Sequence, residues 1–389
     1  MLFLVLSVDT IARSENDAHA FRIVRDIVIE EGARPDPRVI EHVSDGGFVL
    51  GGRMDDDRAA WATALDESGV VRWRYLLKPP NPQVGGYYPY FSGAVPTANG
   101  GVLLCGTIDL GLPRKPEING LLVRLDGKGQ LLRQQFISPG PSESEFSHVA
   151  FFDRCVPWSN GVALVGRVTR YDTDGQRTQF HWIVEANSDG AVQWQKLIPS
   201  KGDGSEPSQV RSISDGGLII SDTETIRIDA QGNLRARFGV VGRSRLVLSA
   251  DAQSVPELLD CLGGQSHGQL IRLTDDLEIA AQQNLPIPPG YLCGPSQYAM
   301  QAYGLTDGSI VLFGFYYENR AHIPGIVKWY SKFSTVSAGR FALGNAPWFN
   351  AATPTGKAGE FATVRVTGAP SVYKQMSNRE THLTIFDVN

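Results

Sequence analysis

Residues 264–268, Gly-Gln-Ser-His-Gly, match the Gly-x-Ser-x-Gly pattern of a nucleophile elbow. Such an elbow places its serine between a strand and a following helix. Here the residues that follow, 269–274, have the composition of another strand. We therefore interpret this run as a glycine-rich hairpin loop and predict no catalytic residue.

Two acidic stretches could hold a cation. Residues 55–57 are three aspartates, and Asp172 begins an Asp-Thr-Asp-Gly run like the start of an EF-hand loop. That loop needs glycine at its sixth position and a bidentate acid at its twelfth. This chain lacks the glycine and has Ile183 in place of the acid. We interpret both stretches as solvated loop acids.

Four of the histidines could serve as metal ligands if the fold gathered them. His148, His181, His267 and His322 never occur at the short spacings of metal-binding motifs. We expect neither a metal nor a cofactor.

The composition narrows the class of protein. The 389 residues are 42% hydrophobic and 20% charged, which is sufficient for a core and unlike a disordered chain. The net charge is −5 with no basic run, so we do not expect a nucleic acid partner. The 42 glycines and 23 prolines favour many turns and few helices.

The first twenty residues differ from the rest. Residues 1–8 are apolar but too short to span a bilayer, and no other stretch could span one. Residues 18–20, Ala-His-Ala, have the small-x-small form of a signal-peptidase site, although charged residues interrupt the segment. We expect residues 1–20 to be a signal-like or disordered segment and residues 21–389 to form one domain. A periplasmic or secreted location follows, with a cytoplasmic one as the alternative.

A glycine-containing turn followed by an apolar strand recurs along the chain. The pattern occupies residues 44–52, 99–106, 160–166, 215–220 and 307–314. A second kind of strand, which ends at a polar turn residue, occurs seven times. These residues are Asp66, Asp126, Asn187, Asp229, Thr274, Ser331 and Asp387. The repeat length of about 54 residues fits a four-stranded propeller blade.

The chain therefore reads as an all-β, seven-bladed β-propeller with four-stranded blades. No outer strand follows Asp387, whereas residues 21–29 precede the first repeat without a unit of their own. We expect 21–29 to pair with 382–387 and close the ring, which removes exposed sheet edges. The competing interpretation of 21–29 is an amphipathic helix.

The repeat resembles bacterial propeller repeats of the delta-sixty type. The shared features are the Asp-Gly-Gly turn and the Leu-Asp-x-x-Gly-x-x-x-Trp segment. It is similar, more loosely, to repeats of pyrroloquinoline-quinone proteins and of the outer-membrane assembly lipoprotein. The Thr-Gly pair of those repeats is absent, and tryptophan follows the turn only at Trp73 and Trp194. The resemblance implies the fold and carries no activity.

The four cysteines contain no C-x-x-C pair. Because each pair lies in neighbouring repeats, we predict disulfides between Cys105 and Cys155 and between Cys261 and Cys293. The alternative is that all four are free, buried thiols.

The loops at the two ends of the strands differ. One end has short, uniform Asp-Gly turns; the other has longer loops rich in Tyr and Arg, residues that dominate binding interfaces. The alternative is that these loops merely tolerate insertion. The residues expected to bind are Tyr87, Tyr88, Tyr90, Arg170, Tyr171, Asp172, Arg177, His181, Tyr316, Tyr317, Arg320 and His322.

We expect an exported, monomeric binding protein whose partner is another protein, for example an inhibitor or immunity-type protein. One alternative is a glycan-acting hydrolase or lyase at the mouth of the channel; another is a structural adaptor in envelope assembly. A convergent polar cluster favours the enzyme, and a broad Tyr-rich patch without one favours the binder.

Overall fold

The computed structural model consists of β-strands joined by turns and loops. It describes residues 21–31, 35–54, 58–78, 89–110, 118–140, 149–171, 176–201, 209–222, 224–239, 244–249, 256–260, 267–288, 291–292, 301–318, 321–330, 336–341, 351–367 and 380–388. No helix occurs in these ranges, so the predicted all-β class is confirmed. Accordingly, the described residues contain no helix long and apolar enough to cross a membrane.

In the first half of the chain the strands pair antiparallel in consecutive runs of four. The first run is β2 (Pro35–His42), β3 (Phe48–Met54), β4 (Ala59–Leu65) and β5 (Val71–Leu77). The second is β6 (Tyr90–Pro96), β7 (Val102–Asp109), β8 (Ile118–Leu125) and β9 (Leu131–Ile137). The third is β10 (Val149–Trp158), β11 (Gly161–Tyr171), β12 (Arg177–Asn187) and β13 (Val192–Pro199). The fourth is β14 (Gln209–Ser212), β15 (Leu218–Ser221), β16 (Thr225–Ile228) and β17 (Leu234–Phe238).

The second half continues the pattern. The next run is β18 (Ser244–Ser249), β19 (Glu257–Asp260), β20 (His267–Leu273) and β21 (Ile279–Pro286). Another is β23 (Gln301–Gly304), β24 (Ile310–Glu318), β25 (Ala321–Trp329) and β26 (Val336–Arg340), with β22 (Tyr291–Leu292) also on β24. The last sheet contains β27 (Ala351–Pro354), β28 (Glu360–Thr367), β29 (Glu380–Asp387) and β1 (Arg22–Glu31).

The first described strand therefore pairs with the last. β1 runs antiparallel to β29, from Arg22 opposite Asp387 to Glu31 opposite Glu380. Residues 21–29 were open to interpretation as strand or helix, and the strand is the observed structure. A partly buried cluster fixes the pairing: the Asp26 carboxylate accepts hydrogen bonds from Arg365 Nη2 at 2.6 Å and Thr384 Oγ1 at 2.6 Å.

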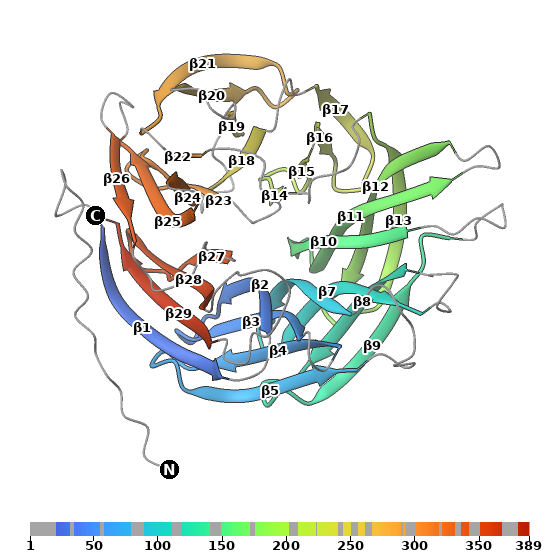
Figure 1. The fold of residues 1–389 in the computed structure, drawn as a ribbon. Helices are drawn as coiled ribbons and strands as arrows, with labels where there is room; N and C mark the ends of the chain where they lie inside the picture. The colour runs from blue at the N-terminus through green and yellow to red at the C-terminus, as the bar shows by residue number, and fades with distance from the viewer. Residues whose placement is uncertain are drawn as a thin grey trace, which may run out of the picture.

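The runs follow one another around a common centre, with β2, β10, β14, β18, β23 and β27 innermost (Figure 1). Inner strands contact the next in turn, as β27 does β2, β2 does β6 and β6 does β10. The strand after the glycine turn is buried along its length in β7 and β15, whereas the outer strand β9 is mostly exposed. This burial is expected when sheets pack face to face.

The turn between the third and fourth strands of a run requires a left-handed residue. Gly129 takes φ +76° there, and its N–H donates to Asp126 O at 3.0 Å. The degenerate repeat at 269–285 keeps the same turn without glycine: Leu277 takes φ +59° and donates to Thr274 O at 3.0 Å. Leu277 is 2% exposed. Its burial offsets a backbone conformation that costs a non-glycine residue about 1–3 kcal/mol.

Candidate functional site

The two ends of the strands form unlike faces. At one end the first turn of several repeats has the same pair of hydrogen bonds. Gly46 N donates to Val43 O and Val43 N to Gly47 O, and the turns at 97–101, 213–217 and 305–309 repeat this arrangement. We call this end the short-turn face.

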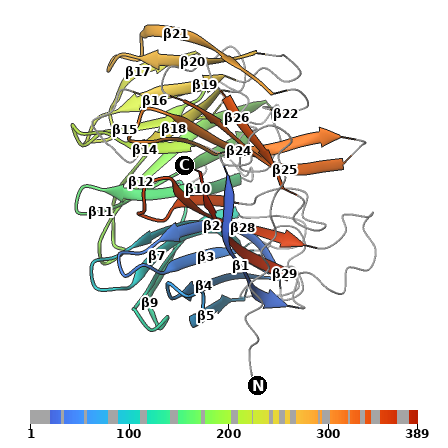
Figure 2. The ribbon, with the colours of Figure 1, turned by 90° about the vertical axis from the view of Figure 1, so that its left-hand side faces the viewer.

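The opposite end, which we call the long-loop face, is uneven. The β11–β12 hairpin stays paired out to Tyr171 opposite Arg177, whereas β15–β16 ends at Ser221 opposite Thr225. The β24–β25 hairpin also continues to Glu318 opposite Ala321, and Figure 2 shows it extending beyond neighbouring strands. The hairpins on this face therefore differ greatly in length, and long loops and hairpins on a β-sheet scaffold are common binding sites.

The structure describes part of the predicted binding set. Tyr90, Arg170, Tyr171, Arg177 and His181 lie in described strands near the long-loop face. For Tyr316, Tyr317 and His322 only the backbone is described, in β24 and β25, where Tyr317 lies opposite His322. Tyr87, Tyr88, Asp172 and Arg320 lie outside the described residues.

Tyr90 belongs to a cluster that the sequence did not reveal. The Arg38 guanidinium carbon lies 4.2 Å from the centroid of the Tyr90 ring. Asp36 orients Arg38, accepting from its Nε at 3.2 Å and its Nη2 at 3.0 Å. Burial raises the pKa of the Tyr90 hydroxyl, so the phenol stays neutral.

The β11–β12 hairpin carries two predicted binding residues in exposed positions. Tyr171 is 38% exposed, and Arg177 opposite it is exposed as well. Arg170 is half-buried, with its guanidinium 5.4 Å from the Phe180 ring. An aromatic ring and guanidinium groups together form a surface suited to protein contact.

His181 does not lie on the surface, which corrects its place among the surface residues. It is 0% exposed and lies in β12, with Nε2 3.0 Å from Glu224 Oε1 and Nδ1 3.3 Å from Asp222 Oδ2. Burial opposes its charge, but the two carboxylates prevail and raise the pKa of His181 to about 9. The buried imidazolium therefore joins the third run of strands to the fourth.

Glu224 completes this cluster. Its Oε1 accepts from Arg237 Nη1 at 2.8 Å and from Lys201 N at 2.9 Å as well as contacting His181. Burial alone would raise the pKa of Glu224, yet these partners lower it to about 2. Each carboxylate here has a cation beside it, so the cluster is a paired structural network.

A second buried pair lies beside it. Arg167 Nε and Nη2 donate to the two Asp153 carboxylate oxygens at 2.9 and 3.1 Å. Burial opposes the charge of Arg167, but the Asp153 carboxylate raises the guanidinium pKa. Both side chains influence the Tyr90 hydroxyl electrostatically, so polar groups from three runs of strands converge below this face.

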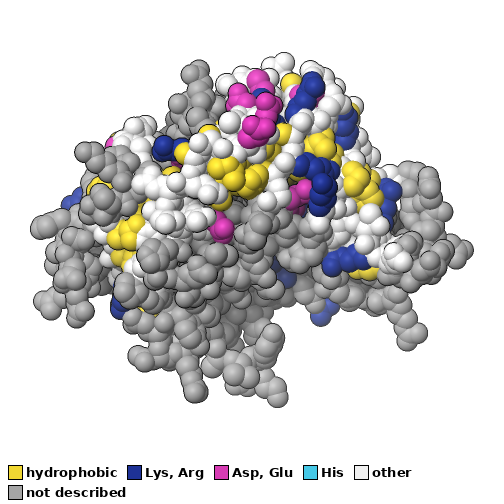
Figure 3. All heavy atoms as spheres, turned by 90° about the horizontal axis from the view of Figure 1, so that it is seen from above, with side chains coloured by type: hydrophobic (Ala, Val, Ile, Leu, Met, Phe, Trp, Pro, Cys, Tyr) yellow, Lys and Arg dark blue, Asp and Glu magenta, His cyan; other side chains and the backbone are white. Residues whose placement is uncertain are grey.

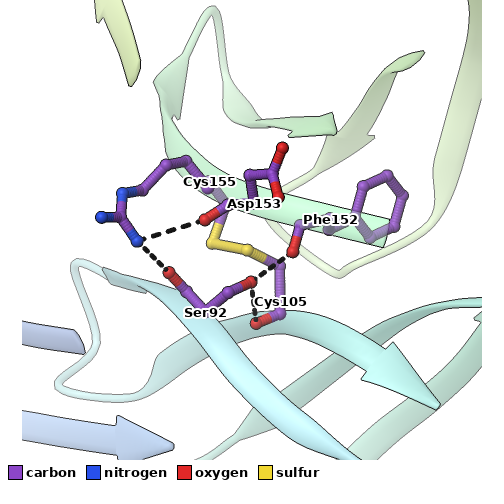
Figure 4. The surroundings of a disulfide bond; sticks show 6 residues. Ser92, Cys105, Phe152, Asp153 and Cys155 are labelled. Carbon is purple, nitrogen blue, oxygen red and sulfur yellow. Dashed lines mark hydrogen bonds between the residues drawn. A yellow bond between two sulfur atoms is a disulfide. The ribbon is translucent and has the colours of Figure 1, made fainter. Parts of the chain in front are cut away.

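The predicted disulfide between Cys105 and Cys155 is present, with Cα atoms 6.1 Å apart (Figure 4). It joins β7 to β10, and Ser92 Oγ donates beside it to Phe152 O at 2.5 Å. Gly93 is required here, because a Cβ would lie 2.7 Å from Cys105 Sγ. Cys261 and Cys293 lie outside the described residues.

The outer surface is less informative about a functional site. Seen from above the view of Figure 1, acidic and basic side chains alternate with separate hydrophobic patches (Figure 3). No group of three or more His, Cys, Asp or Glu side chains that could hold a metal occurs among the residues that the structure describes.

No protein-family model matches the chain, and no curated protein sequence matches it. Among solved structures it is similar to BBS1N in complex with ARL6DN, at 10% identity and TM-score 0.50, covering 95% of this chain and 97% of that one. It is similar to the polysaccharide lyase Uly1 at 12% identity and TM-score 0.50, covering 98% and 95%. A third structure, the Dos1 propeller, has 10% identity and TM-score 0.49, covering 95% of each chain.

These similarities concern the fold alone. With the antiparallel runs around one centre, the two similarities with a TM-score of 0.50 support the β-propeller class for this chain. They carry no activity across such low identity.

Proposed function

We propose that this chain is a seven-bladed β-propeller that binds another protein through its long-loop face. Each run of four strands would be one blade, and β1 would complete the last blade beside β29 and close the ring. The repeats would be of the delta-sixty type, on the strength of the turn and Leu-Asp-x-x-Gly motif.

The observation that carries the binding function is the asymmetry of the two faces. The short-turn face repeats one hydrogen-bonded turn, whereas the long-loop face raises the β11–β12 and β24–β25 hairpins above neighbours such as β15–β16. Tyr171 and Arg177 are exposed at the tip of the first hairpin. Tyrosine supplies large contact area at a low cost in side-chain entropy.

The test uses purified protein as bait in an envelope extract from its source cells, with bound proteins identified by mass spectrometry. A candidate partner is then purified and titrated against the chain by calorimetry. We expect Tyr171→Ala with Arg177→Ala to weaken binding by about 30-fold or more, as for central interface residues. The control, Lys128→Ala with Gln231→Ala, changes exposed residues on the short-turn face and should bind normally.

Three results separate the possibilities. Loss of binding in the control pair but not in the hairpin pair would place the interface on the short-turn face. Unchanged binding in both would refute a central role for the β11–β12 hairpin. The same titration repeated with Tyr88→Ala and Tyr317→Ala tests the remaining predicted tyrosines.

Export and a monomeric state belong to the same proposal. The Cys105–Cys155 disulfide supports export, because disulfides persist in oxidising compartments. Fractionation of the source cells should find the protein in the periplasm or medium, and recovery in the cytosol with free thiols would contradict this. Sedimentation should give the mass of one chain.

Ring closure is tested by deletion of residues 1–30, which removes most of β1. The cut would expose the edge of β29 and the Arg365 guanidinium, which is 3% exposed beside Asp26. We expect a lower melting temperature and a tendency to self-associate. A truncated chain that melts like the full one would refute closure.

A glycan-acting enzyme is the second candidate, and the Tyr90 cluster favours it. A neutral phenol beside the Arg38 guanidinium, with Arg167 nearby, could transfer a proton next to a bound acidic sugar. Anionic polysaccharides offered to the protein would then be cleaved, and Tyr90→Phe would abolish cleavage while leaving the melting temperature unchanged. Absence of cleavage across uronate-containing and neutral glycans would remove this candidate.

A further inference from the structure

A cavity of about 230 Å³ lies among the innermost strands. Its walls come from β2, β10, β14, β18, β23 and β27, that is, from six of the runs of strands. Polar side chains occupy part of the wall: Glu41, Arg154, Gln301 and Tyr303. The cavity is thus central, and the described residues that line it do not include the tips of the β11–β12 and β24–β25 hairpins.

Two of these polar groups are held in place by the protein. Tyr303 Oη donates to Ala352 O at 2.5 Å, and Gln301 Oε1 accepts from Ala352 N at 2.7 Å. Because its oxygen is fixed in this way, the Gln301 amide nitrogen remains as a donor beside the cavity. Fixed donors of this kind are typical of ligand pockets.

Glu41 and Arg154 are the charged pair of the cavity. The Glu41 carboxyl makes no hydrogen bond or ion pair with the described residues, and Arg154 donates through Nη1 only, to Ser92 O at 3.0 Å and Asp153 O at 3.2 Å. The two groups do not form an ion pair with each other, although Arg154 acts on the carboxyl electrostatically. An acid and a guanidinium that share a cavity without pairing leave room for a ligand between them.

Most of the rest of the wall is apolar, and its other polar residues are Gln209 and Thr353. Val156, Val210, Leu248 and Pro354 contribute, with the Cys155 end of the disulfide. The volume is below the several hundred Å³ of pockets for drug-sized molecules. A ligand here would be small, with one aliphatic part and two charged ends.

We propose that this central cavity binds a small zwitterion of the amino-acid type. Its carboxylate would meet the Arg154 guanidinium and the Gln301 amide, its ammonium group would meet the Glu41 carboxylate, and its aliphatic side chain would contact Val156, Val210 and Leu248. Guanidinium and carboxylate are the usual partners for these two ends.

The test is calorimetric titration of the full chain with L-leucine and two matched probes that each lack one charge, isocaproate and isopentylamine. We expect L-leucine to bind and each probe to bind about 30-fold or more weakly, because each leaves one buried charge unpaired. Glu41→Gln should weaken L-leucine to a similar degree. Since the carboxyl must ionise to pair with ammonium, affinity should rise as pH rises through 7; the charged and titratable groups facing it are Arg154 and Tyr303.

Arg154→Gln removes the guanidinium and should also weaken L-leucine binding. If that variant fails to fold, Arg154→Lys takes its place, because it keeps the positive charge but not the planar guanidinium fork. The matched control is Glu67→Gln in an exposed turn, which should bind L-leucine normally. A panel of L-alanine, L-valine and L-glutamate covers other side-chain sizes. The proposal is overturned if no member binds, if isocaproate binds as well as L-leucine, or if affinity is unaffected by both Glu41→Gln and Arg154→Lys.

Discussion

The buried His181 cluster predicts a specific dependence of stability on pH. Its imidazole lies between Asp222 and Glu224 and is 0% exposed. The folded chain raises the pKa of His181 from 6.5 to about 9. Between these two pH values, folded His181 therefore holds a proton that the unfolded chain releases. The resulting stabilisation is complete below pH of about 6.5, declines as pH rises and is lost above about 9.

The size of the effect follows from the two pKa values. Each tenfold difference in proton affinity corresponds to about 1.4 kcal/mol, which gives roughly 3 kcal/mol for His181. The perturbation is His181→Gln, which keeps a polar side chain of similar length without a titrating charge. The difference in unfolding free energy between the natural protein and this variant should shrink by roughly 3 kcal/mol between pH 6 and pH 10.

The assay is equilibrium denaturation in urea at half-unit pH steps. The slope of the unfolding free energy against urea concentration must be the same for both proteins. His42→Gln is the matched control. Burial lowers the pKa of His42, so any pH-dependent change in its contribution to the free energy of unfolding should occur below pH of about 6.5. Glu224→Gln provides a second perturbation, since it removes one of the two carboxylates and should narrow the pH window. A difference between protein and His181→Gln that stays constant from pH 6 to pH 10 would refute a charged His181.

Three further perturbations test other parts of the molecule. Burial raises the pKa of Glu41 to about 7, so stability should fall by up to roughly 3 kcal/mol as pH rises from about 4.5 to 7, and urea denaturation of Glu41→Gln should lack this fall. Asp26→Asn should cost about 1–3 kcal/mol and speed hydrogen exchange in β1, whereas Arg22→Gln, at an exposed ion pair, should do neither. Joint replacement of Cys105 and Cys155 by serine should lower the free energy of unfolding in urea by about 4 kcal/mol, from the chain entropy for a sequence separation of 50 residues.

Most of the strand pattern could be predicted from the sequence because the repeat is local and periodic. A glycine turn, an apolar run and a second polar turn recur, and each is set by backbone geometry within a few residues. The degenerate turn shows how far this holds: Leu277 replaces glycine, yet the hydrogen bonds of the turn are unchanged. The β1–β29 pairing was predictable for a different reason, since it followed from counting strands that lacked partners.

The candidate sites could be predicted far less well, because their partners lie far apart in the chain. His181 directly precedes the apolar run 182–184, and including it in that strand would have predicted its burial. Its partners Asp222 and Glu224 lie in the next run of strands, and no local pattern reveals them.

The same reasoning explains why the central cavity was missed. Glu41 occupies an ordinary position near the end of a strand, and Arg154 follows Asp153 in a mixed run; neither belongs to a motif. They share a cavity only because inner strands of different runs face one centre. In a ring of repeats, local sequence therefore determines each sheet, whereas the chemistry of the centre depends on single residues that arrive from many sheets. A search for function in such a chain should begin with the charged residues of the innermost strands.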